Sequence, residues 1–190
     1  QLFRLITAHP RAWTVVLLLT LARLVLSAQV GLGDDEAYYW DWSRRLDWSY
    51  YDHPPMVAWL IASSTAVFGD TPLAVRLPFV LLSVLGGFLV LILTRQLWPR
   101  HPERAGRAMI VMHIVPILAL GAVFAAPDMP MWVCWVGLIL AARQAHRRDL
   151  LSDWLTLGGV GGLALLSKYT SGLAIMGVLG WLLSTPRGRR

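Results

Sequence analysis

The sequence predicts an all-α integral membrane protein in which several helices cross the bilayer. Its 190 residues are 56% hydrophobic and only 15% charged, whereas a soluble domain carries about a quarter charged residues. Several apolar runs approach the roughly 20 residues that a helix needs to span a membrane. The net charge of +6 comes largely from Arg in the short segments between these runs, where positive charge sets orientation. The charge therefore indicates a lipid bilayer as the surroundings and excludes nucleic acid as the partner.

The first span is expected at residues 12–30, after a short segment that holds Arg4 and Arg11 and no acidic residue. This run is too long for the apolar core of a signal peptide, and no convincing small-residue cleavage site follows it. Arg23 interrupts the run about two helical turns from its outer end. A charged side chain there either extends to the interface or faces the interior of the protein.

A long outer loop, residues 31–70, follows the first span. Asp34 suits the N-cap of a helix, and Asp35 and Glu36 suit the positive N-terminal end of that helix. Residues 34–46 are therefore expected to form a short amphipathic helix on the membrane surface.

The second half of this loop is expected to begin extended and to end helical. Residues 49–53 precede Pro54, and a residue before proline is driven away from the helical conformation. Pro54 and Pro55 suit the first turn of a helix. The helix that they start, residues 55–68, has about 14 residues, which is short for a span. We therefore expect it to be interfacial or re-entrant.

Five further spans are expected in the rest of the chain. Pro116 is expected to kink one of them, and four glycines near residue 160 allow the last two to pack closely. The expected ranges are residues 72–94, 108–125, 129–142, 154–167 and 171–184.

The charges orient these spans. With the amino terminus in the cytoplasm, the inner segments hold twelve of the seventeen cationic residues, as the positive-inside rule requires. Eight of the eleven acidic residues then lie on the outer side. On this topology the outer loop, Arg76, Asp128 and Lys168 all reach the outer face from four separate segments. Their convergence predicts a functional site there.

The carboxylates of the outer loop are candidates for acid–base chemistry. On a helix Asp35 and Tyr39 share one face, and Glu36 and Trp40 share another. One carboxylate can point into a cavity while its neighbours cap the helix, and its pKa rises in low-dielectric surroundings, which makes it a better base. Asp35 and Glu36 are thus the candidate catalytic residues, and Tyr39 is a candidate substrate contact. The alternative is helix capping with interfacial solvation.

Asp52 and His53 stand directly before two prolines. They are candidate substrate contacts that either bind a substrate hydroxyl or form half of a metal site, because Asp and His are both metal ligands. The alternative is a turn that starts a helix, so a divalent metal stays an open alternative and no other cofactor is assigned. The aromatic residues of the loop either stack on sugar rings or occupy the membrane interface. They are Trp40, Trp42, Trp48, Tyr50 and Tyr51.

Lys168 lies inside an apolar, glycine-rich stretch. A lone charge there is costly unless it meets an anion or reaches water. Together with Arg76 it is expected to bind a lipid phosphate, with snorkelling at the end of a span as the alternative. Asp128, at the outer mouth of two spans, is the remaining candidate substrate contact, although an Asp beside proline is ordinary in a loop.

Four separated motifs resemble one family in its own order along nearly the whole chain. The motifs are DDEAYYWDWS with YYDHPPM in the outer loop, AVRL at 74–77, APDMP at 126–130 and GLALLSKYT at 162–170. They resemble the lipid-linked-sugar glycosyltransferases of the GT-C fold. More narrowly, they are similar to the bacterial protein-mannosyltransferase-like and aminoarabinose-transferase-like families.

The resemblance implies a GT-C-type multi-span helical bundle whose long first outer loop contains interfacial helices. It implies an enzyme of the bacterial inner membrane that takes a sugar from a polyprenyl-phosphate carrier on the periplasmic face. The acceptor belongs to the cell envelope and is a lipid, a protein or a polysaccharide. Family members are longer, so residues 1–190 are expected to be the N-terminal part of one transmembrane glycosyltransferase domain.

The resemblance also assigns roles. In members of this family the first outer loop carries an Asp–Glu pair whose Asp serves the acceptor, and Asp35 and Glu36 match this pair. Lys168 matches a residue that contacts the carrier phosphate. The mechanism expected is inverting transfer with Asp35 as the base, while Lys168 and Arg76 stabilise the leaving phosphate. The residues expected to orient the acceptor, or to ligate a metal if one is used, are Glu36, Asp128 and His53.

Two other classes of protein remain open at this point. A transporter or flippase also places ionisable residues along a membrane path, and it predicts charges within spans and broken helices in corresponding halves. A non-catalytic subunit would bind the carrier without turnover. Most charges outside the basic segments lie in one loop, which favours the enzyme.

Overall fold

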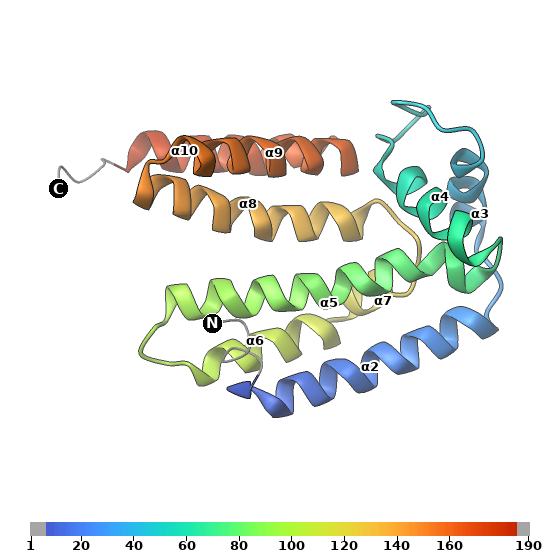
Figure 1. Ribbon diagram of the computed structural model, residues 1–190, viewed down its shortest axis with the longest axis horizontal. Helices are drawn as coiled ribbons and strands as arrows, with labels where there is room; N and C mark the ends of the chain where they lie inside the picture. Colours follow the sequence, from blue (N-terminus) through green and yellow to red (C-terminus); the bar gives the residue numbers. More distant parts are fainter. Residues whose placement is uncertain (1–6, 186–190) are drawn as a thin grey trace.

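The computed structural model describes residues 7–185, and the regular structure in this range is all helical. The long helices lie roughly along one direction in two layers, and two short helices lie at one end (Figure 1). One layer contains α2, α5 and α6, and the other contains α8, α9 and α10. The helices are α2 (Pro10–Gln29), α3 (Asp34–Ser43), α4 (Met56–Phe68), α5 (Pro72–Leu97), α6 (Glu103–Ile114), α7 (Pro116–Gly121), α8 (Asp128–Arg148), α9 (Leu151–Ser167) and α10 (Ser171–Ser184).

Two of these helices, α2 and α5, are long and apolar enough to cross a membrane. The helices α4, α9 and α10 are also apolar but shorter. The prediction of an all-α membrane fold is confirmed. The end of the bundle that carries α3 and α4 is called the outer end below.

Helix α5 is central, because α2, α4, α6 and α8 all pack against it. Its start follows from the sequence: the Thr71 hydroxyl accepts a hydrogen bond from the Ala74 N–H at 3.1 Å, and Pro72 occupies the first helical position. Its first turns then bury apolar residues such as Phe79 together with one charged residue, Arg76. A buried charge near the start of a spanning helix points to a specific partner.

The segment 108–125 differs from the single kinked span that was expected. Helix α6 ends at Ile114, Val115 is extended with φ −60° and ψ 124°, and α7 begins at Pro116. Proline has no N–H and disfavours the helical conformation of the residue before it. Pro116 therefore breaks the helix instead of bending it.

Two helix starts also differ from expectation. The N-cap of α3 is Gly33, and Asp34 is its first helical residue, so the prediction of Asp34 as the N-cap is wrong. The Glu36 side chain reaches back and accepts a hydrogen bond from the Gly33 N–H at 3.0 Å, which satisfies the backbone donor of the N-cap residue. Helix α8 begins at Asp128, whose charge suits the positive end of the helix, and it extends well beyond residue 142 to Arg148.

A buried apolar core joins α3 and α4 to the outer ends of α5 and α8. Tyr39 and Trp42 contribute to it from α3, Val57 and Ile61 from α4, and Phe79 from α5. Fully burying a large apolar side chain stabilises a fold by about 1.5–3 kcal/mol. This core therefore fixes α3, and the acidic residues at its start, on the bundle.

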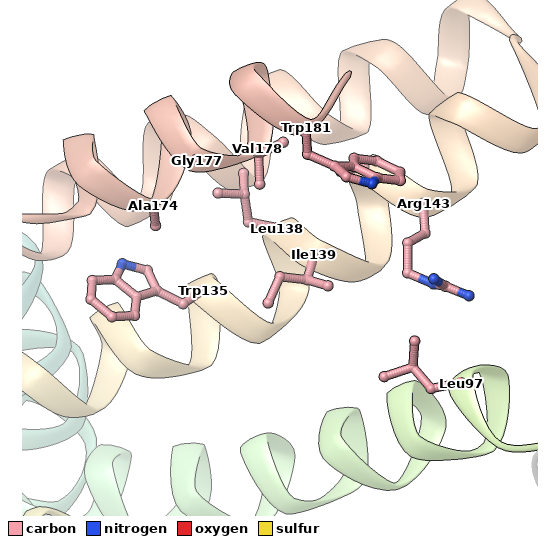
Figure 2. A pocket seen from close by; sticks show the side chains of 10 residues that line it. Leu97, Trp135, Leu138, Ile139, Arg143, Ala174, Gly177, Val178 and Trp181 are labelled. Atoms are coloured by element: carbon pink, nitrogen blue, oxygen red, sulfur yellow. The ribbon is translucent and has the colours of Figure 1, made fainter. Parts of the chain in front are cut away.

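An apolar groove of about 420 Å³ lies along the bundle between α8, α10 and the far end of α5 (Figure 2). Figure 2 shows Trp135 and Ile139 of α8 facing it, with Trp181 of α10 and Leu97 of α5 on its other sides. Arg143 is the charged residue of its lining, and the lining has no carboxylate or imidazole. The groove thus lacks groups for acid–base chemistry, and the candidate site lies at the outer end.

Candidate functional site

The two adjacent carboxylates at the start of α3 lie in different environments. Glu36 is buried, with 3% of its surface exposed. Asp35 is exposed, and no described residue donates a hydrogen bond to its carboxylate. Neighbouring positions on a helix face different directions, so the sequence DDE places one carboxylate inward and leaves the next one open to an incoming group.

Glu36 forms a bidentate ion pair with Arg76 of α5. Arg76 Nε donates to Oε1 at 2.7 Å, and Nη2 donates to Oε2 at 2.5 Å. Oε1 also accepts the Ala125 N–H at 2.9 Å, and Oε2 accepts the Gly33 N–H at 3.0 Å. Both oxygens are therefore occupied, and Glu36 joins α3 to α5 and to the segment between α7 and α8.

The remaining N–H donors of Arg76 bond to the C-terminal end of α2. Its N–H groups also reach the carbonyl oxygens of Ser27 at 3.3 Å, Val30 at 2.6 Å and Gly31 at 2.8 Å. An arginine has five N–H donors, and these bonds use all of them. No donor of Arg76 is left for a phosphate, so in this arrangement the expected phosphate contact falls to Lys168 alone.

The electrostatics of Glu36 agree with a structural partner of Arg76. Burial on its own raises the pKa of the Glu36 carboxyl, but the hydrogen bonds from Arg76, Ala125 and Gly33 outweigh it and hold the pKa below its ordinary value. A carboxylate with a lowered pKa is a weak base at neutral pH. Of the expected catalytic pair, Asp35 is the residue with an open carboxylate.

Tyr39 lies among three carboxylates from different segments. Burial, followed by the negative charges of Asp35, Asp52 and Asp128, raises the pKa of Tyr39 to about 12. The Tyr39 ring also lies beside the His53 ring, with 5.8 Å between their centroids. The outer loop and the start of α8 thus meet around Tyr39, whose hydroxyl stays protonated at neutral pH and can donate a hydrogen bond.

Lys168, in the turn between α9 and α10, completes this end of the bundle. Its Nζ donates to Asp128 Oδ1 at 2.7 Å, and the side chains are 26% and 56% exposed. The neighbouring Tyr169 hydroxyl lies 3.1 Å from the Ser49 hydroxyl of the outer loop. The expected convergence is therefore present in the structure for Asp35, Asp52, Asp128 and Lys168.

The aromatic residues of the outer loop divide into two groups. The rings of Trp42 and Tyr50 stack on each other with centroids 4.5 Å apart, and the Trp40 indole N–H donates to Asp70 at 3.0 Å. These three residues hold the loop together. Trp48 is 77% exposed and Tyr51 is 97% exposed, so these two have free surface for a sugar ring or a membrane interface.

A metal centre does not form from the residues between 7 and 185 alone. No three His, Cys, Asp or Glu side chains in this range gather closely enough to hold a metal ion. Asp52 and His53, the expected half-site, are two ligands of the types that divalent ions accept. They fit the edge of a metal site and fall short of a complete one.

A family model described as dolichyl-phosphate-mannose-protein mannosyltransferase matches residues 52–190. The chain belongs to this family. The match includes three of the four motifs noted above and starts at Asp52, inside the outer loop, so the resemblance to GT-C glycosyltransferases is confirmed.

Curated relatives extend the match towards the amino terminus. Lipid A galacturonosyltransferase RgtD of Rhizobium johnstonii is 33% identical over 156 residues, which cover 82% of the chain and 33% of that protein. Undecaprenyl phosphate-alpha-4-amino-4-deoxy-L-arabinose arabinosyl transferase of Pseudomonas aeruginosa is 30% identical over 163 residues, covering 83% of the chain and 27% of that protein. The chain thus spans about a third or less of the length of these relatives. No solved structure matches it significantly.

Sequence reasoning missed the partners of two site residues. It placed Arg76 at the outer face but did not pair it with Glu36, although a buried charge in a spanning helix needs either an opposite charge or backbone carbonyls as partners. It also did not find the Ala125 N–H, because a backbone donor leaves no mark in the sequence. Tyr169 stands beside Lys168 in the SKYT motif, and that position was the available signal for its contact with the outer loop.

Proposed function

We propose that the chain is the N-terminal part of an inverting glycosyltransferase, which moves a sugar from a polyprenyl-phosphate carrier to a cell-envelope acceptor. The observation that carries this proposal is the meeting of Asp35, Tyr39, Asp52, Asp128 and Lys168 at one end of the bundle. Family membership supports the reaction class. A carboxylate free to accept a proton and a cation suited to phosphate are the two groups that such a transfer needs.

In the proposed reaction, the Asp35 carboxylate takes the proton of an acceptor hydroxyl or amine. The acceptor atom forms a bond to the anomeric carbon from one side, and the bond from that carbon to the carrier phosphate breaks on the other. The configuration is thereby inverted, and the electron pair leaves with the polyprenyl phosphate. Lys168 offsets the charge that develops on the leaving phosphate.

The other site residues orient these groups. The Tyr39 hydroxyl, which stays protonated, donates a hydrogen bond to a substrate oxygen, and Asp52, His53 and Asp128 bind hydroxyl groups of the sugar or the acceptor. Glu36 and Arg76 act indirectly, because their ion pair fixes α3 and therefore the direction of Asp35. If a divalent metal takes part, Asp52 and His53 are the residues that would hold it.

The relatives suggest the substrates and the location. One is named for transfer to lipid A, and the other for an undecaprenyl-phosphate-linked aminoarabinose donor. We therefore propose an undecaprenyl-phosphate-type donor and an acceptor of the lipid A class for the whole protein. The proposed location is the bacterial inner membrane, with the amino terminus cytoplasmic and the site on the periplasmic face, which agrees with the twelve inner cations.

Transfer of radiolabelled sugar from polyprenyl-phosphate donors, in membranes that contain the whole protein, tests this proposal. Loss of a general base costs about 10²–10⁴-fold in rate, so Asp35→Asn is expected to lower transfer by at least the smaller factor. Asp34→Asn is the matched control, since Asp34 is the preceding carboxylate in the same helical turn. Undiminished transfer by Asp35→Asn would overturn the role of Asp35. Carrier binding without transfer by the unaltered protein would favour a binding subunit.

A transporter has one observation in its favour. Arg23 is buried among the helices and the α6–α7 helix is broken, as a transporter predicts for its ion path. Arg23 is, however, satisfied by hydrogen bonds inside the protein. Uptake or flipping of the carrier by the unaltered protein, without any transfer, would favour transport over catalysis.

A further inference from the structure

Arg23 faces the interior of the bundle and not the interface. Its side chain is buried between α2, α5 and α6, with 5% of its surface exposed. Nη1 lies 2.9 Å from His113 Nδ1 and 3.4 Å from Ser83 Oγ, and Nη2 donates to the His113 carbonyl oxygen at 2.8 Å. The ion pairs found within residues 7–185 do not include Arg23. A cation inside the bundle is thus held by neutral groups alone.

The direction of these hydrogen bonds fixes the state of His113. A guanidinium only donates, so His113 Nδ1 must be the acceptor and carry no proton. The ring is therefore the neutral tautomer with its proton on Nε2. Its Nε2 faces Gly87 of α5, where a side-chain Cβ would lie 2.5 Å away. Gly87 thus lets α6 approach α5 closely enough for Arg23 to reach both acceptors of His113.

The His113 carbonyl is open because of Pro116. In a continuous helix the N–H of residue 117 would bond to this oxygen, but the chain is extended at Val115 and α7 starts anew at Pro116. An unpaired carbonyl away from water costs free energy. Arg23 supplies the hydrogen-bond donor that the helix break removed. The break thus provides an acceptor for the buried cation, and the cation provides a donor for the open carbonyl.

The segment that starts at this break leads to the proposed site. Helix α7 has no buried residue, and Ile117 is 76% exposed. Beyond α7, the Ala125 N–H bonds to Glu36, and Asp128 then meets Lys168. Residues 115–121 are therefore held at the break by Arg23, with no buried side chain in α7, whereas beyond them Ala122 and Ala125 enter the buried core of the outer end and Glu36 accepts the Ala125 N–H.

We propose that Arg23 is a positioning residue: by capping the helix break at Pro116 it sets the path of residues 115–127, and thereby the places of Ala125 and Asp128 in the site. Its influence on transfer rests on the proposed function. Its influence on the path of the segment does not. Both effects run through the His113 carbonyl, so they depend on the break that leaves this carbonyl open.

The test is a double-mutant cycle between Arg23→Leu and Pro116→Ala in the whole protein, reconstituted in lipid nanodiscs. An alanine at position 116 restores a backbone N–H and lifts the restriction on Val115, so the helix can continue and the N–H of Ile117 can bond to the His113 carbonyl. Cys134 is the sole cysteine of residues 1–190. Replacing it, together with any cysteine in the rest of the whole protein, by serine gives a background for spin labels at Val67 and Ile117, both largely exposed. The distance distribution between these labels reports the path of α7 without any assay of activity.

In the Pro116 background, Arg23→Leu is expected to broaden this distribution, whereas Leu21→Ala, a change at a lipid-exposed position of α2, leaves it unchanged. Transfer is expected to fall about 10–100-fold in kcat with little change in KM for the carrier, as misplaced groups cause. In the Pro116→Ala background the effect of Arg23→Leu on both readouts should shrink towards that of the control. Arg23→Lys, which keeps a donor for one acceptor, should recover part of the loss.

An unchanged distribution in Arg23→Leu would overturn the proposal, and so would an effect of equal size in both backgrounds. If Arg23→Leu does not fold, Arg23→Lys carries the cycle, because it keeps the charge and loses one of the two bonds to His113. A distribution that responds as expected, in a protein without transferase activity, would support the role of Arg23 and reject the proposed function separately.

Discussion

Two ion pairs lie at the same end of the bundle and differ mainly in burial. In Glu36–Arg76 the side chains are 4% and 1% exposed, whereas in Asp128–Lys168 they are 56% and 26% exposed. The first pair satisfies every donor of the arginine and both carboxylate oxygens. The second leaves Lys168 with further N–H groups and Asp128 in contact with solvent. A carboxylate and a cation thus form a buried link between helices in Glu36–Arg76, and in Asp128–Lys168 they form a solvent-exposed contact that another group can reach.

The largest difference between the two ion pairs is expected in their contribution to the free energy of unfolding. Removing one member of a buried ion pair costs about 3–5 kcal/mol, because the other charge stays buried without a partner. We expect Arg76→Met to lower the free energy of unfolding by this amount, and Arg76→Lys to lower it as well, since one ammonium cannot replace a planar fork of donors. Thermal unfolding of the purified protein measures both. Lys168→Met removes the same charge from the exposed pair and should lower the free energy of unfolding by less than about 1 kcal/mol. Equal losses in Arg76→Met and Lys168→Met would contradict the distinction between the buried and the exposed pair.

Carrier binding should show the reverse order. A hydrogen bond to a charged group contributes about 1.5–3 kcal/mol, so Lys168→Met is expected to weaken binding of polyprenyl phosphate about tenfold or more. Asp128→Asn should strengthen it, because Lys168 is then no longer neutralised by a carboxylate 2.7 Å away. Equilibrium binding in nanodiscs measures the two changes. Weaker binding by Asp128→Asn would mean that Asp128 holds Lys168 in place and does not compete with the phosphate.

Acid should weaken the buried pair in a defined range. The pKa of Glu36 is lower in the folded protein than its ordinary value of 4.5, so the stability from its ionised form is present above that value. It is lost as the pH falls below about 4.5 towards the folded pKa. The melting temperature measured between pH 3 and 7 should drop more steeply at the acid end for the unaltered protein than for Glu36→Gln. Parallel curves would show that Glu36 does not contribute to the acid sensitivity.

The smallest effect is expected at the exposed aromatic residues. Tyr51 makes no contribution to the core, so Tyr51→Ala should change stability by less than about 0.5 kcal/mol. Trp42, which is buried and stacked on Tyr50, serves as the contrasting position, because removing a core aromatic costs about 3–5 kcal/mol. If Tyr51→Ala lowers transfer without lowering the melting temperature, Tyr51 contacts a substrate; if it lowers neither, its ring only faces the interface.

Much of the arrangement was predictable from the sequence because lipid limits the choices. Apolar runs such as 72–94 and 171–184 lie in α5 and α10 with ends close to those expected. The charges predicted the convergence of the outer loop, Asp128 and Lys168. Local rules were sufficient wherever the signal was a run of residues or a charge in an apolar setting.

The remainder depended on contacts between distant segments. Whether Glu36 or Asp35 faces inward depends on Arg76, which lies 40 residues further along the chain. Pro116 accounts locally for the end of α6, but the partner of the His113 carbonyl that the break leaves open is Arg23, 90 residues earlier in the chain. Neither outcome is written in the local sequence, because each is decided by a partner that only the fold supplies.

The hydrogen bonds from Arg76 to the end of α2 also have a consequence for biosynthesis. A ribosome delivers α2 to the membrane before it has made Arg76, so the carbonyl oxygens of Ser27, Val30 and Gly31 lack these donors when the first span is inserted. Exposed carbonyls favour water over lipid, which keeps this end of α2 at the surface until α5 arrives. The arginine of the later helix thus completes the earlier one, and the order of insertion becomes part of how the outer loop finds its place.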